Sequence, residues 1–164
     1  MTNYIKISLG IFLALAASRF VPHPPNFTSL IALSFYVPVL LGRKYIFILF
    51  LSFIITDLVI GFHQIVLFTW CSILFIGYLS KYFVQSFKSR ISGSLLGAGL
   101  FFLITNFGVW LTGSYGFTLE GLSLCYMLAI PFFGNTLAST LIYSSVIEII
   151  NFQYKKIKSK TFGN

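Results

Sequence analysis

The stretch FIITDLVIGFHQIVLFTWC, residues 53–71, decides the fold. Two apolar runs flank the short sequence GFHQ, the pattern of two helices joined by a tight turn. An acid, Asp57, lies inside the first run, an imidazole, His63, lies in the turn, and a thiol, Cys71, lies in the second run. Runs this apolar belong in a membrane, where an ionisable side chain is costly unless it is paired or faces water. The stretch therefore predicts two antiparallel membrane helices with a polar feature near their turn.

The composition of the whole chain also indicates an integral membrane protein. Of its 164 residues, 57% are hydrophobic and 9% are charged, whereas an ordinary globular domain has about 25% charged residues. The formal net charge of +8 does not indicate nucleic-acid binding, because the basic residues lie between apolar runs and at the C-terminus. Two cysteines are too few for a disulfide framework.

The expected fold is an all-α bundle of six transmembrane helices, since a bilayer core needs about 20 apolar residues per helix and fewer where the membrane thins. The expected spans are residues 4–20, 29–41, 45–60, 65–83, 91–111 and 119–152. The last region is too long for one span, so Pro131 is expected to divide it into a short outer helix and a main span from about Gly134. Residues 1–152 then form a single transmembrane domain, and residues 153–164 form a basic cytoplasmic tail.

The N-terminal segment allows two interpretations. Lys6, the apolar run after it and the small residues Ala14 and Ala16 resemble a signal peptide with a cleavage site. The alternative is a first membrane helix that is never cut. We expect the helix to be kept, because the topology of the chain is consistent with it.

The distribution of Lys and Arg predicts the orientation. Ten basic residues fall on one side of the expected spans, and Arg19 alone falls on the other. The ten are Lys6, Arg43, Lys44, Lys81, Lys88, Arg90, Lys155, Lys156, Lys158 and Lys160. Loops rich in Lys and Arg stay cytoplasmic. Both termini are therefore expected in the cytoplasm.

Polar and aromatic side chains gather at the expected outer side. The outer connections are VPHPPNFTS (21–29), GFHQ (61–64) and TGSYGFTLEG (112–121), and Asp57 and Cys71 lie at similar depths on neighbouring helices. The candidate substrate-binding residues are Cys71, Asp57, His23, Asn26, His63, Trp70, Asn106, Trp110 and Tyr115. We expect Asp57, Cys71, Asn106 and Trp110 to converge in one cavity that opens outward. No residue is expected to be catalytic.

Each of these candidates also has a structural interpretation. Asp57 could be an interfacial acid bonded to Thr56, His63 or a backbone amide. A membrane cysteine is usually a small apolar packing residue. His23 and His63 could be polar loop residues, and the tryptophans could belong to an interfacial aromatic belt. Two cysteines and two histidines suggest zinc only weakly, because no CxxC or HxxxH spacing is present.

Three small residues on the first helix suggest a contact surface. Gly10, Ala14 and Ala17 occupy i, i+4 and i+7, so they form a smooth face that another helix can approach closely. This face could pack inside the bundle or dock on a partner membrane subunit.

Four stretches carry a resemblance to a known family. SRFVPHPPNFTSLIALSFY (18–36), TDLVIGFH (56–63), FFLITNFGVWL (101–111) and GLSLCYMLAIPFFGNTLASTLIYS (121–144) resemble small bacterial membrane proteins related to the substrate-binding S-components of energy-coupling-factor (ECF) vitamin transporters. The similarity runs over about residues 10–148. It implies a six-helix S-component-like fold in a bacterial inner membrane, vitamin uptake, and a shared ECF module as a partner that docks on the Gly10/Ala14/Ala17 face.

Within that family the chain looks most similar to the solitary cobalamin-transporting S-components. Their membrane cysteine ligates the cobalt of cobalamin, and an aspartate one helix earlier lies near the thiol. The resemblance implies that Cys71 binds the cobalt of a bound corrinoid and that Asp57 accepts the thiol proton, with cobalamin as the ligand and no intrinsic cofactor.

Other function classes stay open. The chain could bind a different small solute with Cys71 as a packing residue, it could process corrinoids as a thiol-dependent membrane enzyme, or it could be a structural subunit without a ligand. Because the sequence has no nucleotide-binding motif, any ATP hydrolysis must come from a partner.

Overall fold

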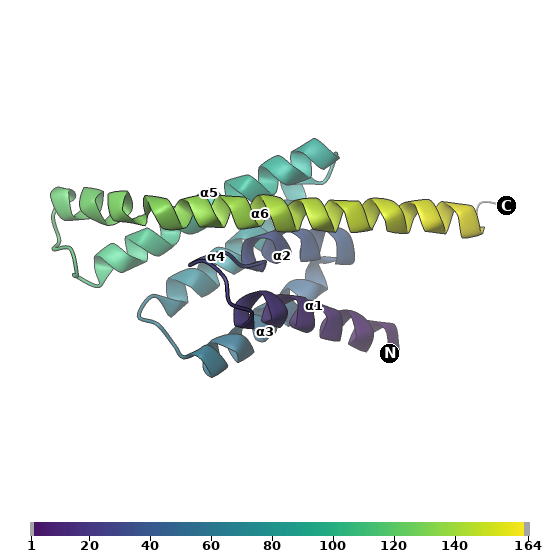
Figure 1. Ribbon diagram of the computed structural model, residues 1–164, viewed down its shortest axis with the longest axis horizontal. Helices are drawn as coiled ribbons and strands as arrows, with labels where there is room; N and C mark the ends of the chain where they lie inside the picture. The colour runs from purple at the N-terminus through teal and green to yellow at the C-terminus, as the bar shows by residue number, and fades with distance from the viewer. Residues whose placement is uncertain (1, 163–164) are drawn as a thin grey trace.

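The computed structural model describes residues 2–162 and is built of helices (Figure 1). Within this range the chain forms no strand. Three helical stretches, Val66–Phe83, Phe87–Leu111 and Leu119–Ser159, are long and apolar enough to cross a membrane. The all-helical class is confirmed, and the protein is a membrane protein by these helices.

The helices follow the apolar runs of the sequence closely. In chain order they are α1 (Thr2–Phe20), α2 (Leu30–Tyr36), α3 (Ile46–Ile60), α4 (Val66–Leu79), α5 (Phe87–Leu111) and α6 (Leu119–Phe162). Short helical segments extend three of them: a π-helical turn, Val37–Leu41, follows α2, a 3-10 turn, Arg43–Tyr45, precedes α3, and another, Ser80–Phe83, follows α4. α5 begins four residues earlier than expected, because Ser86 caps it by accepting a hydrogen bond from the backbone N–H of Ser89.

The two ends of the helical assembly differ in character. The beginning of α1 and the end of α6 lie at the same end in Figure 1, which we call the terminal end. At the opposite end, the loop end, residues from the connections 21–29, 61–65 and 112–118 line a common cavity. The basic segment before α3 belongs to the terminal end, since Lys44 lies over the ring of Tyr4 in α1, 5.6 Å from its centroid.

Helix α6 runs without a break through Pro131, so the expected division at this proline is wrong. Proline removes one backbone hydrogen bond, and membrane helices tolerate this because local adjustments and neighbours satisfy the freed carbonyl. With 44 residues, α6 is roughly 66 Å long at about 1.5 Å per residue. This is about twice the thickness of a bilayer core. Residues 153–162 of the expected tail continue the helix, and residues 163 and 164 lie outside the described range.

Helix α2 lies at the centre of the molecule (Figure 1). All seven of its residues are buried, and it packs against α4, α5 and α6 as well as α1 and α3. A helix that is apolar all round is expected at such a position. The loop that precedes α2 is tied to α6 by hydrogen bonds from Asn135 and Ser139.

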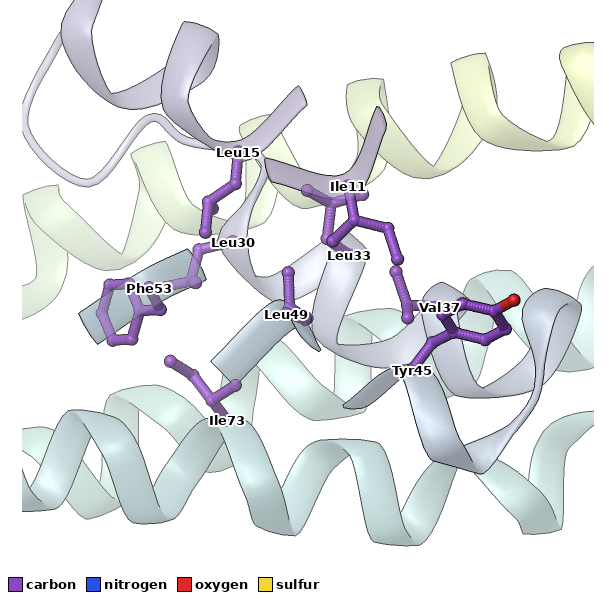
Figure 2. Packing of buried hydrophobic residues seen from close by; sticks show 9 residues of the cluster. All are labelled: Ile11, Leu15, Leu30, Leu33, Val37, Tyr45, Leu49, Phe53 and Ile73. Carbon is purple, nitrogen blue, oxygen red and sulfur yellow. The ribbon is translucent and has the colours of Figure 1, made fainter. Parts of the chain in front are cut away.

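One hydrophobic cluster joins the first four helices (Figure 2). Its members are Ile11, Leu15, Leu30, Leu33, Val37, Tyr45, Leu49, Phe53 and Ile73. Leu15 of α1 and Leu49 of α3 are fully buried. The cluster fixes α1 against α3 and thereby sets the position of the polar residues at the ends of these helices.

Candidate functional site

Asp57 forms a buried ion pair with Arg19. Nη2 of Arg19 lies 2.6 Å from Oδ1 of Asp57, and Nη1 of Arg19 donates a 2.7 Å hydrogen bond to Thr56. Asp57 is 1% exposed. The guanidinium also lies over the ring of Phe53, 4.5 Å from its centroid. The acid is therefore neutralised by Arg19, across the interface between α1 and α3.

Trp70 completes this cluster from α4. Its indole Nε1 donates a 2.8 Å hydrogen bond to Oδ2 of Asp57, so both carboxylate oxygens have a partner. The local partners expected for Asp57 were Thr56, His63 or a backbone amide, whereas its carboxylate binds Arg19 and Trp70. The expectation that it serves as a free proton acceptor for a thiol is not supported, since the carboxylate is bonded on both oxygens.

Cys71 lies on an exposed face of α4. One residue advances a helix by about 100°, so the step from Trp70 to Cys71 turns the side chain away from Asp57. Cys71 does not line either of the two loop-end cavities described below, whereas Cys125 is buried and does. The expected convergence of Asp57, Cys71, Asn106 and Trp110 in one cavity is therefore wrong.

The larger cavity at the loop end, cavity 1, has a volume of about 470 Å³. It lies between α4, α5 and α6 and is covered by residues of the three loop-end connections. Its polar lining is Asn26, His63, Thr69, Thr105, Asn106, Tyr115, Cys125 and Thr136. Its apolar lining is Ile65, Phe101, Phe102, Val109, Leu128, Ala129, Phe132 and Phe133. This mixture of aromatic walls and a few polar groups is typical of small-molecule sites.

A second cavity, cavity 2, adjoins the first and has a volume of about 340 Å³. It lies nearer α1, α2 and α3, and Arg19, His23, Thr28 and Phe53 are among its lining residues. The two cavities share five residues, Asn26, His63, Thr69, Phe101 and Thr136. Cavities 1 and 2 therefore adjoin, and we refer to them together as the hollow region.

The proline-rich loop that covers this region is tied to α6. Asn135 donates a 3.0 Å hydrogen bond from Nδ2 to the carbonyl of Pro25, and Ser139 reaches the carbonyl of Asn26 at 3.5 Å. Asn26 has a φ of 63°, a left-handed conformation that asparagine tolerates better than most residues. These contacts hold Asn26 between the two cavities.

The side chains of cavity 1 leave acceptors and donors for a ligand. The hydroxyls of Thr69, Thr105 and Thr136 donate to carbonyls of their own helices, so their oxygen lone pairs stay available. Asn106 donates from Nδ2 to the carbonyl of Phe102 at 2.8 Å, which leaves its amide oxygen as an acceptor. Phe102 and Phe133 stack with their centroids 4.5 Å apart, and they give the wall a flat aromatic surface.

Five of the nine candidate residues line the hollow region: His23, Asn26, His63, Asn106 and Tyr115. Asp57 and Trp70 do not line it, but Arg19, which pairs with Asp57, lines cavity 2. Trp110 packs between Phe107 and Phe117, and its buried Nε1 has no hydrogen-bond partner. Cys71 faces away.

Sequence reasoning missed Arg19 and Cys125 as lining residues and the phenylalanines of α5 and α6. Arg19 could have been found, because it is the one basic residue on its side and Asp57 needed a cation. The phenylalanines could not, since the chain has 20 of them and most face lipid or core. Within residues 2–162, no three His, Cys, Asp or Glu side chains come together in a way that could hold a metal ion.

Comparisons with known proteins show one family. No curated protein and no solved structure matches the chain. A family profile matches residues 1–159, which is nearly the whole chain. The chain therefore belongs to the Family of unknown function (DUF6580).

Proposed function

We propose that the protein is a solute-binding membrane subunit, similar to an S-component, that takes up a small vitamin-like molecule through cavities 1 and 2. The observation that carries the proposal is the hollow region at the loop end, with aromatic walls and hydrogen-bonding groups from four helices. A volume of about 470 Å³ for cavity 1 falls within the range of roughly 300–1,000 Å³ that small-molecule sites have.

In this proposal the loop end faces the outside of the bacterial inner membrane. The basic residues support this orientation, since the loops with Lys and Arg and the lysines of α6 belong to the terminal end, and such segments stay cytoplasmic. The six helical segments then cross the membrane in alternating directions, with both termini in the cytoplasm. α2 and α3 are shorter than a standard span, with 7 and 15 residues, which local thinning of the bilayer accommodates.

The chemistry of the lining favours an uncharged or anionic solute with a flat apolar part. Arg19, His23 and His63 contribute to the walls, and no described acidic residue does. The phenylalanines of α5 and α6 offer surfaces for ring stacking. Asn106 and the threonines would hydrogen-bond to polar groups on the rim of such a ring.

A corrinoid is the solute that the family resemblance implies, and we keep it as the first ligand to test. A thiol–cobalt bond would then come from Cys125, because Cys125 lines cavity 1 and Cys71 does not. Thiolate is a suitable ligand for cobalt. If the solute is a smaller vitamin, both cysteines are packing residues.

The proposed partner surface is the small-residue face of α1. Gly10, Ala14 and Ala17 are all exposed, and a Cβ atom at Gly10 would meet nothing within 4 Å. The opposite face of α1 packs into the core through Ile11 and Leu15. This arrangement favours docking on another membrane subunit, such as a shared ECF module, over packing inside the bundle.

The proposal is tested by ligand binding to the purified protein in detergent, with cobalamin and a panel of smaller vitamins. We expect one compound to bind the wild type and the Cys71→Ser variant equally and to lose its affinity in Thr136→Leu, because a leucine there fills the wall that both cavities share. For cobalamin, the absorbance spectrum should change in Cys125→Ser and not in Cys71→Ser. Equal binding by wild type and Thr136→Leu would contradict the site.

A further inference from the structure

Most of the basic side chains at the terminal end have no acidic side chain of this chain to pair with. The sequence holds three acidic residues. Asp57 is paired with Arg19, and Glu148 is held by Arg90, whose Nη2 lies 2.7 Å from Oε2 of the carboxylate. Glu120 lies in the first turn of α6, at the loop end. The counter-charges for most of the other Lys and Arg residues must therefore come from outside the chain.

Arg43 and Lys81 belong to two segments that meet at the terminal end. Ile46, in the first turn of α3, packs so closely on Gly77 of α4 that a Cβ atom added there would lie 2.5 Å from its Cδ1. The π-helical turn before Arg43 also packs against the 3-10 turn that contains Lys81. Arg43 is close enough to Tyr78 to act electrostatically on its phenol. Two basic side chains that are far apart in the sequence therefore share one surface.

Two tyrosines hold the ammonium group of Lys81 at this surface. Its Nζ lies 3.8 Å from the ring centroid of Tyr78 and 4.7 Å from that of Tyr82, so cation–π attraction restricts its position. Both rings are more than half exposed, and Arg43 is exposed as well. An ammonium has three N–H donors and a guanidinium has five, so the two side chains keep donors for an anion from outside.

The surface lies at the depth of lipid headgroups. Lys81 is in the last turn of the apolar stretch Val66–Phe83, which is long enough to cross a membrane. Arg43 lies in the connection between the apolar helix Leu30–Leu41 and α3. Tyrosine is enriched where a membrane-spanning helix reaches the headgroups, and the rings beside Lys81 fit that position.

Exposed apolar side chains continue from this surface toward the middle of the membrane. Phe47, one turn beyond Arg43 on α3, is 70% exposed, and Phe75, about one turn before Tyr78 on α4, is 43% exposed. A lipid whose phosphate lies at Arg43 and Lys81 therefore has apolar surface for its acyl chains on the same two helices. An acidic protein that docks from the water phase would not reach this surface, so the arrangement favours a lipid.

The orientation of the chain explains only part of this arrangement. The preference of basic loops for the cytoplasm requires Lys and Arg residues at this end but no fixed geometry for them. It does not account for an ammonium group held between two exposed rings beside a guanidinium. Lys44 is held separately, over the rings of Tyr4 and Tyr45 at 5.6 and 5.2 Å from their centroids, so it adds positive charge from the side of α1.

We propose that Arg43 and Lys81 bind the phosphate group of an anionic phospholipid in the leaflet at the terminal end. The guanidinium of Arg43 donates two parallel hydrogen bonds to phosphate oxygens, and Lys81 adds a point charge. Basic sites between membrane helices bind anionic headgroups in this way. A zwitterionic phospholipid carries an ammonium group that both side chains repel, so the site distinguishes the two lipid classes. The site is separate from cavities 1 and 2 and does not depend on a solute.

The test is lipid binding to the purified chain in detergent, measured by native mass spectrometry. The probes are dioleoylphosphatidylglycerol, which is anionic, and dioleoylphosphatidylcholine, which is zwitterionic and has the same acyl chains. We expect the wild type to bind the anionic lipid several-fold more tightly, and the double variant Arg43→Gln/Lys81→Gln to bind both lipids equally. Glycerophosphoglycerol, the anionic headgroup without acyl chains, should displace little of the bound lipid.

A matched control removes the same amount of charge elsewhere. Lys156→Gln/Lys158→Gln changes two exposed lysines of α6 and should keep the wild-type preference. Thermal unfolding in detergent shows whether each variant is folded, and Lys81→Gln alone, a milder change, should already reduce the preference.

Three results overturn the proposal. They are equal binding of the two lipids by the wild type, an unchanged preference in folded Arg43→Gln/Lys81→Gln, and an equal loss of preference in the control, which would show that net charge alone is sufficient. Full displacement by glycerophosphoglycerol would also overturn it, in favour of a soluble phosphate compound. Because no vitamin is added, none of these results bears on solute binding at cavities 1 and 2.

Discussion

Nη2 of Arg19 lies 2.6 Å from Oδ1 of Asp57, although the two residues are 38 positions apart in the chain. The pair joins the end of α1 to the end of α3, and the indole of Trp70 binds the same carboxylate from α4. One acid thus connects three helices at the loop end. Arg19 lines cavity 2, so the acid that it neutralises lies directly behind the wall of that cavity.

The first prediction concerns the removal of this acid. Asp57→Asn should lower the free energy of unfolding by about 3–5 kcal/mol, because it leaves the guanidinium of Arg19 in a buried site without a counter-charge. Equilibrium unfolding in detergent measures the change. The matched control is Glu120→Gln, which neutralises an exposed acid at the same end and should have little effect.

A double variant separates the unpaired charge from the lost contacts. Arg19→Gln combined with Asp57→Asn should be more stable than Asp57→Asn alone, because it removes both charges. Equal stability of the single and double variants would show that the ion pair is not what connects α1 to α3.

The second prediction compares the two tryptophans. Trp70→Phe removes a hydrogen bond to a carboxylate, a contact that is worth about 1.5–3 kcal/mol. Trp110→Phe removes a similar amount of ring, but the buried Nε1 of Trp110 has no hydrogen-bond partner. Trp70→Phe should therefore be the more destabilising variant in the same unfolding assay, and the reverse order would contradict the assignment of the indole bond.

The third prediction uses two glycines of α5. A Cβ atom at Gly93 would lie 2.5 Å from Cγ of Phe83 and 2.7 Å from Cε2 of Phe35, so Gly93→Ala should cost about 1–3 kcal/mol through overpacking. A Cβ atom at Gly99 would meet nothing within 4 Å. Gly99→Ala should be neutral or stabilising by up to about 1 kcal/mol, because alanine is the better helix former. Thermal unfolding of the two variants side by side distinguishes close packing of α5 from a loosely held helix.

The sequence was sufficient for the all-helical class and for most helix boundaries but not for the rotation of the helices about their own axes. Counting residues from the turn placed Asp57 and Cys71 at similar depths, because depth depends only on rise per residue. Which of Trp70 and Cys71 faces Asp57 depends on an angle of about 100° per residue, and apolar side chains surround α4 on every side. No pattern in the chain fixes that angle.

The sequence did not identify Arg19 as the partner of Asp57, for a different reason. Thr56 and His63 are near Asp57 in the sequence and were the local alternatives, while Arg19 reaches it only because α1 packs against α3 through Leu15 and Leu49. Pro131 led to the wrong prediction of a helix end, because a proline usually breaks a helix. It lies inside α6, whose backbone must stay hydrogen-bonded in a membrane. Long-range packing and the bilayer override local signals in both cases.

The central claim, a solute site that opens to the outside at the loop end, is tested most directly by thiol accessibility in intact cells. Asn106→Cys lines cavity 1, and Leu103→Cys lies one turn earlier on an exposed, apolar face of α5. Both are made with Cys71→Ser and Cys125→Ser, and a small anionic methanethiosulfonate reagent is added outside the cells. The account predicts that Asn106→Cys reacts quickly, that Leu103→Cys does not, and that a bound solute slows the reaction. Reaction of Asn106→Cys only when the reagent has access from the cytoplasm, or a rate no faster than that of Leu103→Cys, would contradict it.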